Sequence, residues 1–112
     1  MSSKLASKHC VPCRGGTPPL TPPQREELLR ELGAGWEVQD GHHLHKQYTF
    51  KNFADALAFV NRVGEVAESE GHHPDIFLTW GKVGITTWTH AIDGLTESDF
   101  VLAAKADAVL TA

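Results

Sequence analysis

The residues from 36 to 50 alternate between polar and apolar side chains with a period of two. Trp36 and Val38 are apolar positions between polar neighbours, and the dipeptide Asp40-Gly41 that follows is typical of tight hairpin turns. In the return strand, residues 42–50, apolar residues recur at every second position from Leu44 to Phe50, with Lys46 as the exception. Alternation of this kind predicts half-buried strands, so this stretch predicts a β-hairpin.

A second hairpin is predicted after the sequence His72-His73-Pro74. Residues 75–80 and 83–90 both have the composition of strands, and Gly81-Lys82 joins them. Because the residue before a proline is driven away from helical geometry, His72-His73-Pro74 is expected to form a loop that leads into this hairpin.

Three helices are predicted between and around the hairpins. Thr21, followed by two prolines and Gln24, is a helix-start pattern, and a broad apolar stripe with helical spacing covers residues 53–69. A second capping pattern at residues 96–99 opens a helix that continues to about residue 109. The expected fold is α+β, in the order α-β-β-α-β-β-α, with a four-stranded antiparallel sheet and helices packed on one face. We assign residues 1–20 to a flexible leader and residues 21–112 to a single domain.

Length and charge narrow the functional classes. The 112 residues suffice for one domain, and the net charge of −4 argues against direct binding to nucleic acid phosphates. No apolar run approaches the length of about 18 residues that suggests a membrane span, and the first ten residues lack the apolar core of a secretory signal. We therefore interpret the chain as cytoplasmic, with no membrane partner.

The leader contains both cysteines, Cys10 and Cys13, in a CxxC arrangement. Structural zinc sites use four ligands, and no second CxxC or suitably spaced histidine pair follows. A persistent disulfide is not expected in a reducing compartment. We interpret the cysteines as two thiols of a loosely ordered segment whose role the sequence leaves open.

Seven histidines are a high count for this length, and three readings of them compete. A metal site is not predicted, because His42 and His43 are expected on opposite faces of a strand and His72 and His73 are adjacent in sequence. For His42, His43 and His45 we favour ordinary surface groups.

A third reading is that His72, His73 and His90 act as acid–base groups. If residues 75–80 pair with residues 83–90, the end of the second strand returns to the beginning of the first, which brings His90 back to His72 and His73. Histidine has a reference pKa of about 6.5, so it can both give and take protons near neutral pH. The pattern therefore indicates a site for proton transfer.

Several of these segments resemble the pterin-4a-carbinolamine dehydratase family. The similarity lies in Glu68-xxx-His72-His73-Pro74, in the strand that ends at Thr89-His90, and in Gly94-Leu95-Thr96-Glu97-Ser98-Asp99, and it covers about residues 20–110. The leader segment CVPCRGGTPPL is also similar to that of bacterial members. One departure is Ile76, which occupies a position where the family often has an aromatic residue.

The resemblance implies roles for individual residues. It implies that His72 and His90 are the general acid/base pair and that His73 binds and orients the pterin. Asp99, Glu68 and Trp36 would also contribute to substrate binding. Each of these three has a structural alternative: Asp99 is the third residue of a helix that starts at a capping box, Glu68 could lie on a solvated helix face, and Trp36 could belong to the core.

The activity implied by the resemblance is removal of water from a 4a-hydroxytetrahydropterin, which gives quinonoid dihydropterin, in tetrahydrobiopterin recycling. Such a reaction needs no cofactor, because the ring nitrogen beside the hydroxyl-bearing carbon can expel the hydroxyl. The implied partners are the pterin, further copies of the chain in a homodimer or homotetramer, and a pathway with an aromatic amino acid hydroxylase. The alternative is a non-catalytic module of the same fold, such as a dimerisation cofactor of transcription factors or a Rubisco assembly factor.

Overall fold

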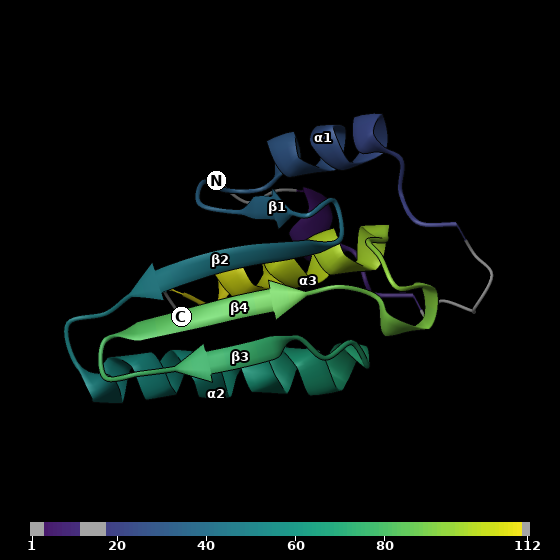
Figure 1. The fold of residues 1–112 in the computed structure, drawn as a ribbon. Coiled ribbons are helices and arrows are strands. Elements are labelled where there is room, and N and C mark those ends of the chain that lie inside the picture. Colours follow the sequence, from purple (N-terminus) through teal and green to yellow (C-terminus); the bar gives the residue numbers. More distant parts are fainter. Residues whose placement is uncertain (1–3, 12–17, 111–112) are drawn as a thin grey trace.

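A computed structural model describes residues 4–11 and 18–110. Its helices and strands follow the predicted order α-β-β-α-β-β-α, which confirms the α+β fold (Figure 1). The elements are α1 (Pro22–Glu31), β1 (Glu37–Gln39), β2 (His43–Thr49), α2 (Phe53–Glu70), β3 (Asp75–Leu78), β4 (Lys82–Thr87) and α3 (Glu97–Ala108), with short 3-10 helices η1 (Lys4–Ser7) and η2 (His90–Ile92). Among these helices, none is both long and apolar enough to cross a bilayer.

The four strands form one antiparallel sheet in the order β1-β2-β4-β3. Asp40 and Gly41 both have positive φ angles, 57° and 62°, which is the geometry of the tight hairpin turn predicted between β1 and β2. The two central strands come from different hairpins, and α2 and α3 lie against one face of the sheet (Figure 1). The arrangement leaves β1 and β3 as the edge strands.

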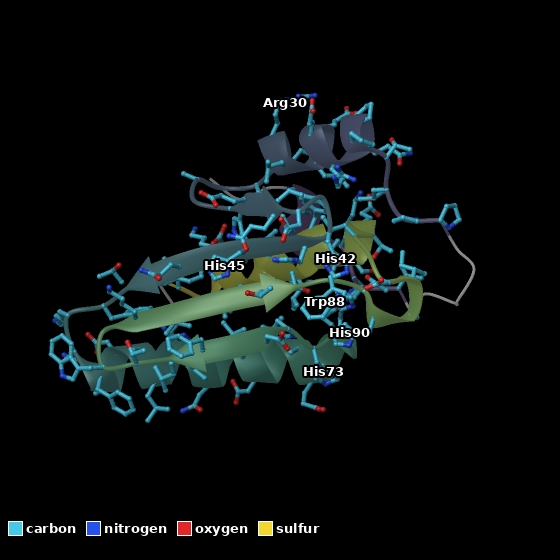
Figure 2. All side chains as sticks on the ribbon, viewed as in Figure 1. Arg30, His42, His45, His73, Trp88 and His90 are labelled. Atoms are coloured by element: carbon cyan, nitrogen blue, oxygen red, sulfur yellow. The ribbon has the colours of Figure 1, made fainter. Side chains whose placement is uncertain are left out.

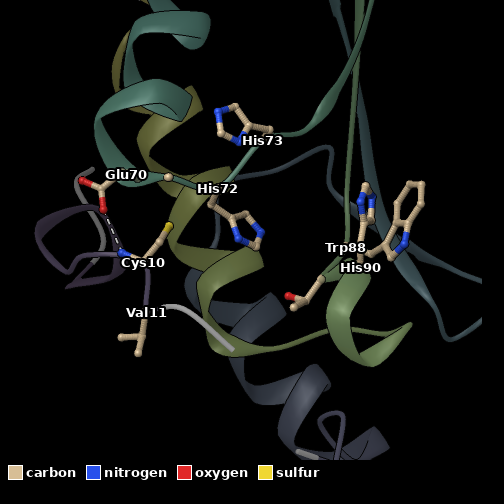
Figure 3. A pocket seen from close by; sticks show the side chains of 9 residues that line it. Cys10, Val11, Glu70, His72, His73, Trp88 and His90 are labelled. Atoms are coloured by element: carbon tan, nitrogen blue, oxygen red, sulfur yellow. Dashed lines mark hydrogen bonds between the residues drawn. The ribbon is translucent and has the colours of Figure 1, made fainter. Parts of the chain in front are cut away.

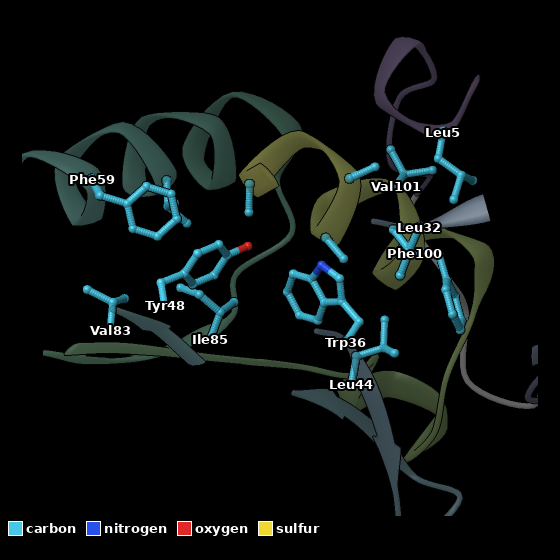
Figure 4. Packing of buried hydrophobic residues seen from close by; sticks show 14 of the residues in the cluster. Leu5, Leu32, Trp36, Leu44, Tyr48, Phe59, Val83, Ile85, Phe100 and Val101 are labelled. Atoms are coloured by element: carbon cyan, nitrogen blue, oxygen red, sulfur yellow. The ribbon is translucent and has the colours of Figure 1, made fainter. Parts of the chain in front are cut away.

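The core lies between the sheet and the two long helices (Figure 4). Phe59 and Val63 of α2 and Phe100 of α3 are fully buried there, opposite the sheet residues Leu44 and Ile85. The spacing of Phe59 and Val63 places both on one face of α2, so the predicted apolar stripe does turn toward the sheet.

Lys46, the exception in the alternation of β2, belongs to a polar cluster inside this core. Its ammonium group donates to Asp107 of α3 at 2.8 Å, the hydroxyl of Tyr48 donates to the same oxygen at 2.6 Å, and the indole N–H of Trp36 donates to the other oxygen at 3.0 Å. Trp36 is buried in this cluster. The structure thus places Trp36 in the core, where it joins the first hairpin to α3, and its contribution to substrate binding stays a prediction.

The leader differs from the expectation of a flexible segment. Residues 4–7 form η1, and Leu5 is 0% exposed because it packs in the core beside Val101 of α3 (Figure 4). The sequence did not indicate this, since a single leucine among polar neighbours carries no periodic signal. Cys13 lies outside the described residues, so the CxxC pair cannot be placed as a unit.

The second hairpin is shorter than predicted at its C-terminal end. Strand β4 stops at Thr87, and His90 begins η2 instead of ending the strand. Thr89 pairs only with Gly94 in an isolated bridge, and Asp93 turns the chain with a φ angle of 52°. The chain therefore bends away from the sheet before His90 and directs this residue into a loop.

Candidate active site

The end of α2 fixes the position of His72. Gly71 caps the helix in the left-handed conformation, with a φ angle of 65°, which glycine adopts at little cost. The backbone N–H of His72 still donates to the carbonyl of Ala67 at 3.2 Å. His72 is thus held directly beyond the last turn, and His73-Pro74 leads from there into β3.

The register of the second hairpin brings the start of β3 and the end of β4 together, as predicted. Asp75 pairs with Thr86, so the residues that follow β4 lie beside those that precede β3. A pocket of about 340 Å³ opens there, and it brings His72, His73 and His90 into one site (Figure 3). Its lining residues are Cys10, Val11, Glu70, Gly71, His72, His73, Trp88, Thr89 and His90.

His72 is tied to a buried carboxylate. Its Nε2 atom lies 2.6 Å from Oδ1 of Asp99, and the His72 side chain is 13% exposed whereas Asp99 is 0% exposed. Since a carboxylate only accepts hydrogen bonds, Nε2 carries the proton. This contact leaves Nδ1 as the ring nitrogen that can exchange a proton with a ligand in the pocket.

Asp99 accepts three further hydrogen bonds. The hydroxyls of Thr87 and Thr89 donate to it at 2.8 Å each, and the backbone N–H of Thr96 donates at 3.0 Å. The last of these belongs to the predicted capping box at the start of α3. Asp99 is 0% exposed and lies behind His72, so it does not line the pocket, and its contribution to substrate binding stays a prediction.

His73 and Glu68 form a looser pair. The carboxylate oxygens of Glu68 lie 3.4 and 3.5 Å from Nε2 of His73, and both side chains are exposed. His73 lines the pocket, but Glu68 lies outside it and borders a neighbouring depression on α2. The structure therefore places His73 at the pocket and Glu68 beside His73 but outside the pocket, and the part of Glu68 in substrate binding stays a prediction.

Trp88 is a pocket residue that the sequence reading did not single out. Its ring centroid lies 4.4 Å from that of His90, with the planes inclined at 50°, and both side chains border the pocket (Figure 3). The signal that could have found it is the period of the strand, since Trp88 and His90 are two residues apart in the same alternation.

His42 and His43 lie behind Trp88, and this corrects two expectations about them. Their rings approach Trp88 with centroid distances of 5.4 and 6.0 Å, so both lie near a residue that lines the pocket. Figure 2 shows His42 beside Trp88. Their Nδ1 atoms lie 3.2 Å apart, because His42 precedes β2 and the alternation of faces does not apply to it. His42 also contacts the carboxylate of Asp93 at 2.7 Å.

The opposite wall of the pocket comes from the leader. The backbone N–H of Cys10 donates to Glu70 at 2.8 Å, and Cys10 and Val11 line the pocket on the side of His72 that faces away from Trp88 and His90 (Figure 3). The Glu70 side chain is 8% exposed, and the hydrogen bond from Cys10 is the main cause that lowers the pKa of its carboxyl below the ordinary value. Within residues 4–11 and 18–110, no group of three or more ligand-type side chains could hold a metal ion.

Comparison with known proteins identifies the family of this chain. The family model described as pterin 4 alpha carbinolamine dehydratase matches residues 18–109. The chain belongs to the pterin-4a-carbinolamine dehydratase family. These enzymes are hydro-lyases, and the match spans both hairpins and the three α-helices.

Two bacterial members of this dehydratase family resemble almost the whole chain. A protein of Rubrobacter xylanophilus is 61% identical over 105 residues, which cover 94% of this chain and 97% of that protein. A protein of Alkaliphilus metalliredigens is 52% identical over 105 residues, which cover 94% of this chain and 95% of that protein. Both carry provisional names as pterin-4-alpha-carbinolamine dehydratases. Because these matches omit only seven residues of the 112, they include part of the leader that precedes the family match.

Two solved structures of dehydratase-like proteins share the fold. A transcriptional coactivator/pterin dehydratase from Brucella melitensis is 34% identical, with a TM-score of 0.77, and the match covers 82% of this chain and 98% of that one. A pterin dehydratase-like protein described as a RuBisCO assembly factor in the alpha-carboxysome is 27% identical, with a TM-score of 0.58 and coverage of 70% and 92%. The fold thus occurs in proteins described both as dehydratases and as binding factors.

Proposed function

We propose that this chain is a 4a-hydroxytetrahydropterin dehydratase in which His72 and His90 transfer the protons. The substrate carries a hydroxyl and a ring nitrogen on the same carbon. The lone pair of the nitrogen forms a double bond to that carbon as the hydroxyl leaves, and one imidazolium protonates the hydroxyl so that it departs as water. The second histidine then removes the proton from the nitrogen, and quinonoid dihydropterin results.

The observation that carries the proposal is the contact between His72 and Asp99 at the wall of a pocket that His90 also lines. A buried carboxylate that accepts from one ring nitrogen fixes both the tautomer and the orientation of the imidazole. His72 therefore presents a defined nitrogen to the ligand. A proton-transfer group that is preorganised in this way contributes a factor of about 10²–10⁴ to the rate.

The aromatic side of the pocket suits a flat heterocycle. Trp88 offers an indole at the pocket wall, and aromatic surfaces bind planar rings through burial and offset stacking. From the loop that precedes β3, His73 can donate a hydrogen bond to a polar edge of the same ring. Substrate orientation and proton transfer are thereby assigned to different side chains.

The test is dehydration of chemically generated 4a-hydroxytetrahydropterin, followed by stopped-flow absorbance. Wild-type protein should accelerate water loss, and His72→Ala and His90→Ala should each lose most of that acceleration while keeping the wild-type circular dichroism spectrum. Rates equal to buffer for the wild-type protein would eliminate the proposal. The second candidate, a non-catalytic binding role, would then be favoured by the likeness to the assembly factor.

We also propose that the chain forms a homodimer or homotetramer. Strand β3 is an edge strand, and Phe77 on it and Trp80 just after it are exposed by 67% and 68%. An uncovered strand edge beside large apolar side chains favours association between chains. Light scattering coupled to size exclusion would give the mass, and a monomer at micromolar concentration would exclude this assembly.

A further inference from the structure

We propose that residues 4–11 form a wall of the substrate pocket and help to select the substrate, with Glu70 and Ser98 as the contacts that hold this wall in place. We call residues 4–11 the N-terminal wall. The inference rests on the proposed dehydratase function and assigns a part of its binding site. The wall precedes residue 18, where the match to the family model begins.

The N-terminal wall is fixed at its far end by α3. Leu5 is fully buried against the core, the ammonium group of Lys105 donates to the carbonyl of Ala6 at 3.0 Å, and Lys8 pairs with Glu97 at 3.1 Å. The buried leucine anchors the segment, since exposing its side chain to water would cost free energy. The ion pair of Lys8 is exposed and adds little.

Its near end is fixed beside the pocket by hydrogen bonds to the backbone. The carboxylate of Glu70 accepts the N–H of Cys10 at 2.8 Å. The hydroxyl of Ser98 accepts the N–H of Val11 at 2.8 Å and donates to the carbonyl of Val11 at 3.2 Å. The thiol of Cys10 donates to the carbonyl of Ser98 at 3.4 Å. Because most of these contacts use main-chain atoms, they fix the path of the chain and keep Cys10 and Val11 at the pocket, with the Val11 side chain 65% exposed.

Glu70 is the central contact of this end. Besides Cys10 it contacts His9 at 3.0 Å and Lys105 at 3.7 Å, so one buried carboxylate joins the wall to α2 and α3. Glu70 also lines the pocket, immediately before Gly71 and His72. A change at Glu70 therefore displaces the wall on the side of the pocket where His72 lies (Figure 3).

The size of the pocket makes the wall consequential. Its volume of about 340 Å³ lies near the lower end of the range of roughly 300–1,000 Å³ found for ligand sites. A wall that closes one side of so small a site limits the substituents a bound ring can carry. Removal of the wall should weaken binding and reduce discrimination between ring substituents, whereas His72, His90 and Asp99 stay in place.

The experiment compares Glu70→Ala and Ser98→Ala with Glu65→Ala. Glu65 is an exposed residue of the same helix, outside the pocket, so its variant is the matched control for the loss of one carboxylate. Ser98→Ala removes both hydrogen bonds to Val11 without a change in charge. Hydrogen exchange reports whether the amides of Cys10 and Val11 have lost protection in each variant.

The expected result is a rise of about fivefold to tenfold in KM for Glu70→Ala and Ser98→Ala, the effect of losing one or two hydrogen bonds of the wall. The value of kcat should remain within about twofold of wild type, since the proton-transfer groups are untouched. The ratio of kcat/KM between a pterin with a methyl group and one with a dihydroxypropyl group at the same ring carbon should move toward one. Glu65→Ala should match wild type in every respect.

If the amides of Cys10 and Val11 exchange faster in the variants while KM and the ratio of kcat/KM between the two pterins stay at wild-type values, the proposed role of the wall in substrate selection is wrong. The proposed dehydratase function is not affected by that result. If wild type has no dehydratase activity, the proposed function fails by itself. In that case the role of the wall in binding is tested by the dissociation constant of a tetrahydropterin that lacks the 4a hydroxyl, measured by tryptophan fluorescence for wild type, Glu70→Ala and Ser98→Ala. An unchanged constant in both variants, or no binding to wild type, would overturn it.

Alkylation of Cys10 gives a second readout in a protein that keeps Glu70 and Ser98, the residues that hold the wall. In a Cys13→Ser background, the same tetrahydropterin at saturating concentration should slow the reaction of Cys10 with iodoacetamide severalfold, because the thiol borders the occupied pocket. An alkylation rate that the bound pterin does not alter would contradict the placement of the wall beside the ligand.

Discussion

Helix α3 carries two aspartates about two turns apart, and they have different consequences. Asp99 accepts from His72, two threonines and a backbone N–H, whereas Asp107 accepts from Trp36, Lys46 and Tyr48. Both carboxylates connect the sheet to the same helix. Only Asp99 has a partner that reaches a pocket and can exchange a proton near neutral pH.

The number of hydrogen bonds therefore does not separate Asp99, which holds a pocket residue, from Asp107, which supports the core. Tyr48, one of the partners of Asp107, keeps its proton near neutral pH. Burial, followed by the hydrogen bond to Asp107, raises the pKa of Tyr48 well above its ordinary value of 10.0, so its hydroxyl remains a donor. The cluster around Asp107 is therefore a support for the first hairpin, and the cluster around Asp99 holds His72, a residue that lines the pocket.

The largest effect is expected at the histidine that Asp99 supports. His72→Ala should lower kcat by a factor of about 10²–10⁴, because a proton-transfer group is lost. His45→Ala is the matched control, since His45 contacts Thr86 and lies outside the pocket. Stopped-flow rates measure both, and a His72→Ala enzyme with wild-type kcat would refute the role of this histidine.

The next effect separates the two aspartates directly. Asp99→Asn should reduce kcat by at least about 10- to 100-fold, the range for carboxylates that orient metal-bound histidines, because the amide can also donate and no longer fixes the tautomer of His72. Asp107→Asn should leave kcat unchanged. Both substitutions should lower the free energy of unfolding by about 1–3 kcal/mol, as measured by urea denaturation. Equal effects of the two on kcat would erase the distinction.

A smaller effect is expected at Trp88. Trp88→Ala should raise KM by about threefold to tenfold, the equivalent of losing one aromatic contact, and Trp88→Phe should restore most of the affinity. Titration with a tetrahydropterin that lacks the 4a hydroxyl measures this effect by calorimetry. If Trp88→Phe and Trp88→Ala bind alike, the indole does not contact the ligand through its aromatic surface.

The cluster around Asp107 predicts a change in stability without a change in rate. Tyr48→Phe should lower the free energy of unfolding by about 1 kcal/mol. The raised pKa of Tyr48 in the folded protein contributes stability that is complete below about pH 10 and is lost as the pH rises above it. Urea titrations between neutral and strongly alkaline pH should therefore show a shallower loss for Tyr48→Phe than for wild type.

The smallest effect concerns acid stability. Glu70 has a lowered pKa in the folded protein, so its contribution is present above its ordinary value of 4.5 and is lost as the pH falls through the lowered value. Wild type should lose stability over this acid range more steeply than Glu70→Gln does. Parallel curves for the two proteins in urea titrations would show that Glu70 does not couple stability to pH.

The parts of this fold that follow from local pattern could be predicted from the sequence. The turn at Asp40-Gly41, the capping box that contains Asp99 and the return of His90 toward His72 depend on dipeptides, spacings and the pairing of adjacent strands. Such contacts are close in sequence, so the sequence specifies them without knowledge of the tertiary arrangement.

Other parts depend on contacts between distant residues. Cys10 reaches Glu70 across 60 positions and Val11 reaches Ser98 across 87, and no local pattern indicates either contact. Trp36 has an ambiguous sequence signal, because an indole in a first strand is more often part of the core but can also border a ligand pocket, and its contact with Asp107 is not visible in the sequence. The orienting role of Asp99 likewise became visible only when its burial behind His72 was known.

The docking of Leu5 and Ala6 on α3 has a consequence for the order of events during synthesis. The N-terminal wall is synthesised before α3, because Lys105, the partner of Ala6, lies 99 positions further along the chain. Chains are synthesised at roughly 5–20 residues per second, so several seconds separate the synthesis of the wall from that of α3, on which it docks. The pocket therefore remains open until α3 has folded, and a ribosome-bound chain lacking this helix has no closed substrate site.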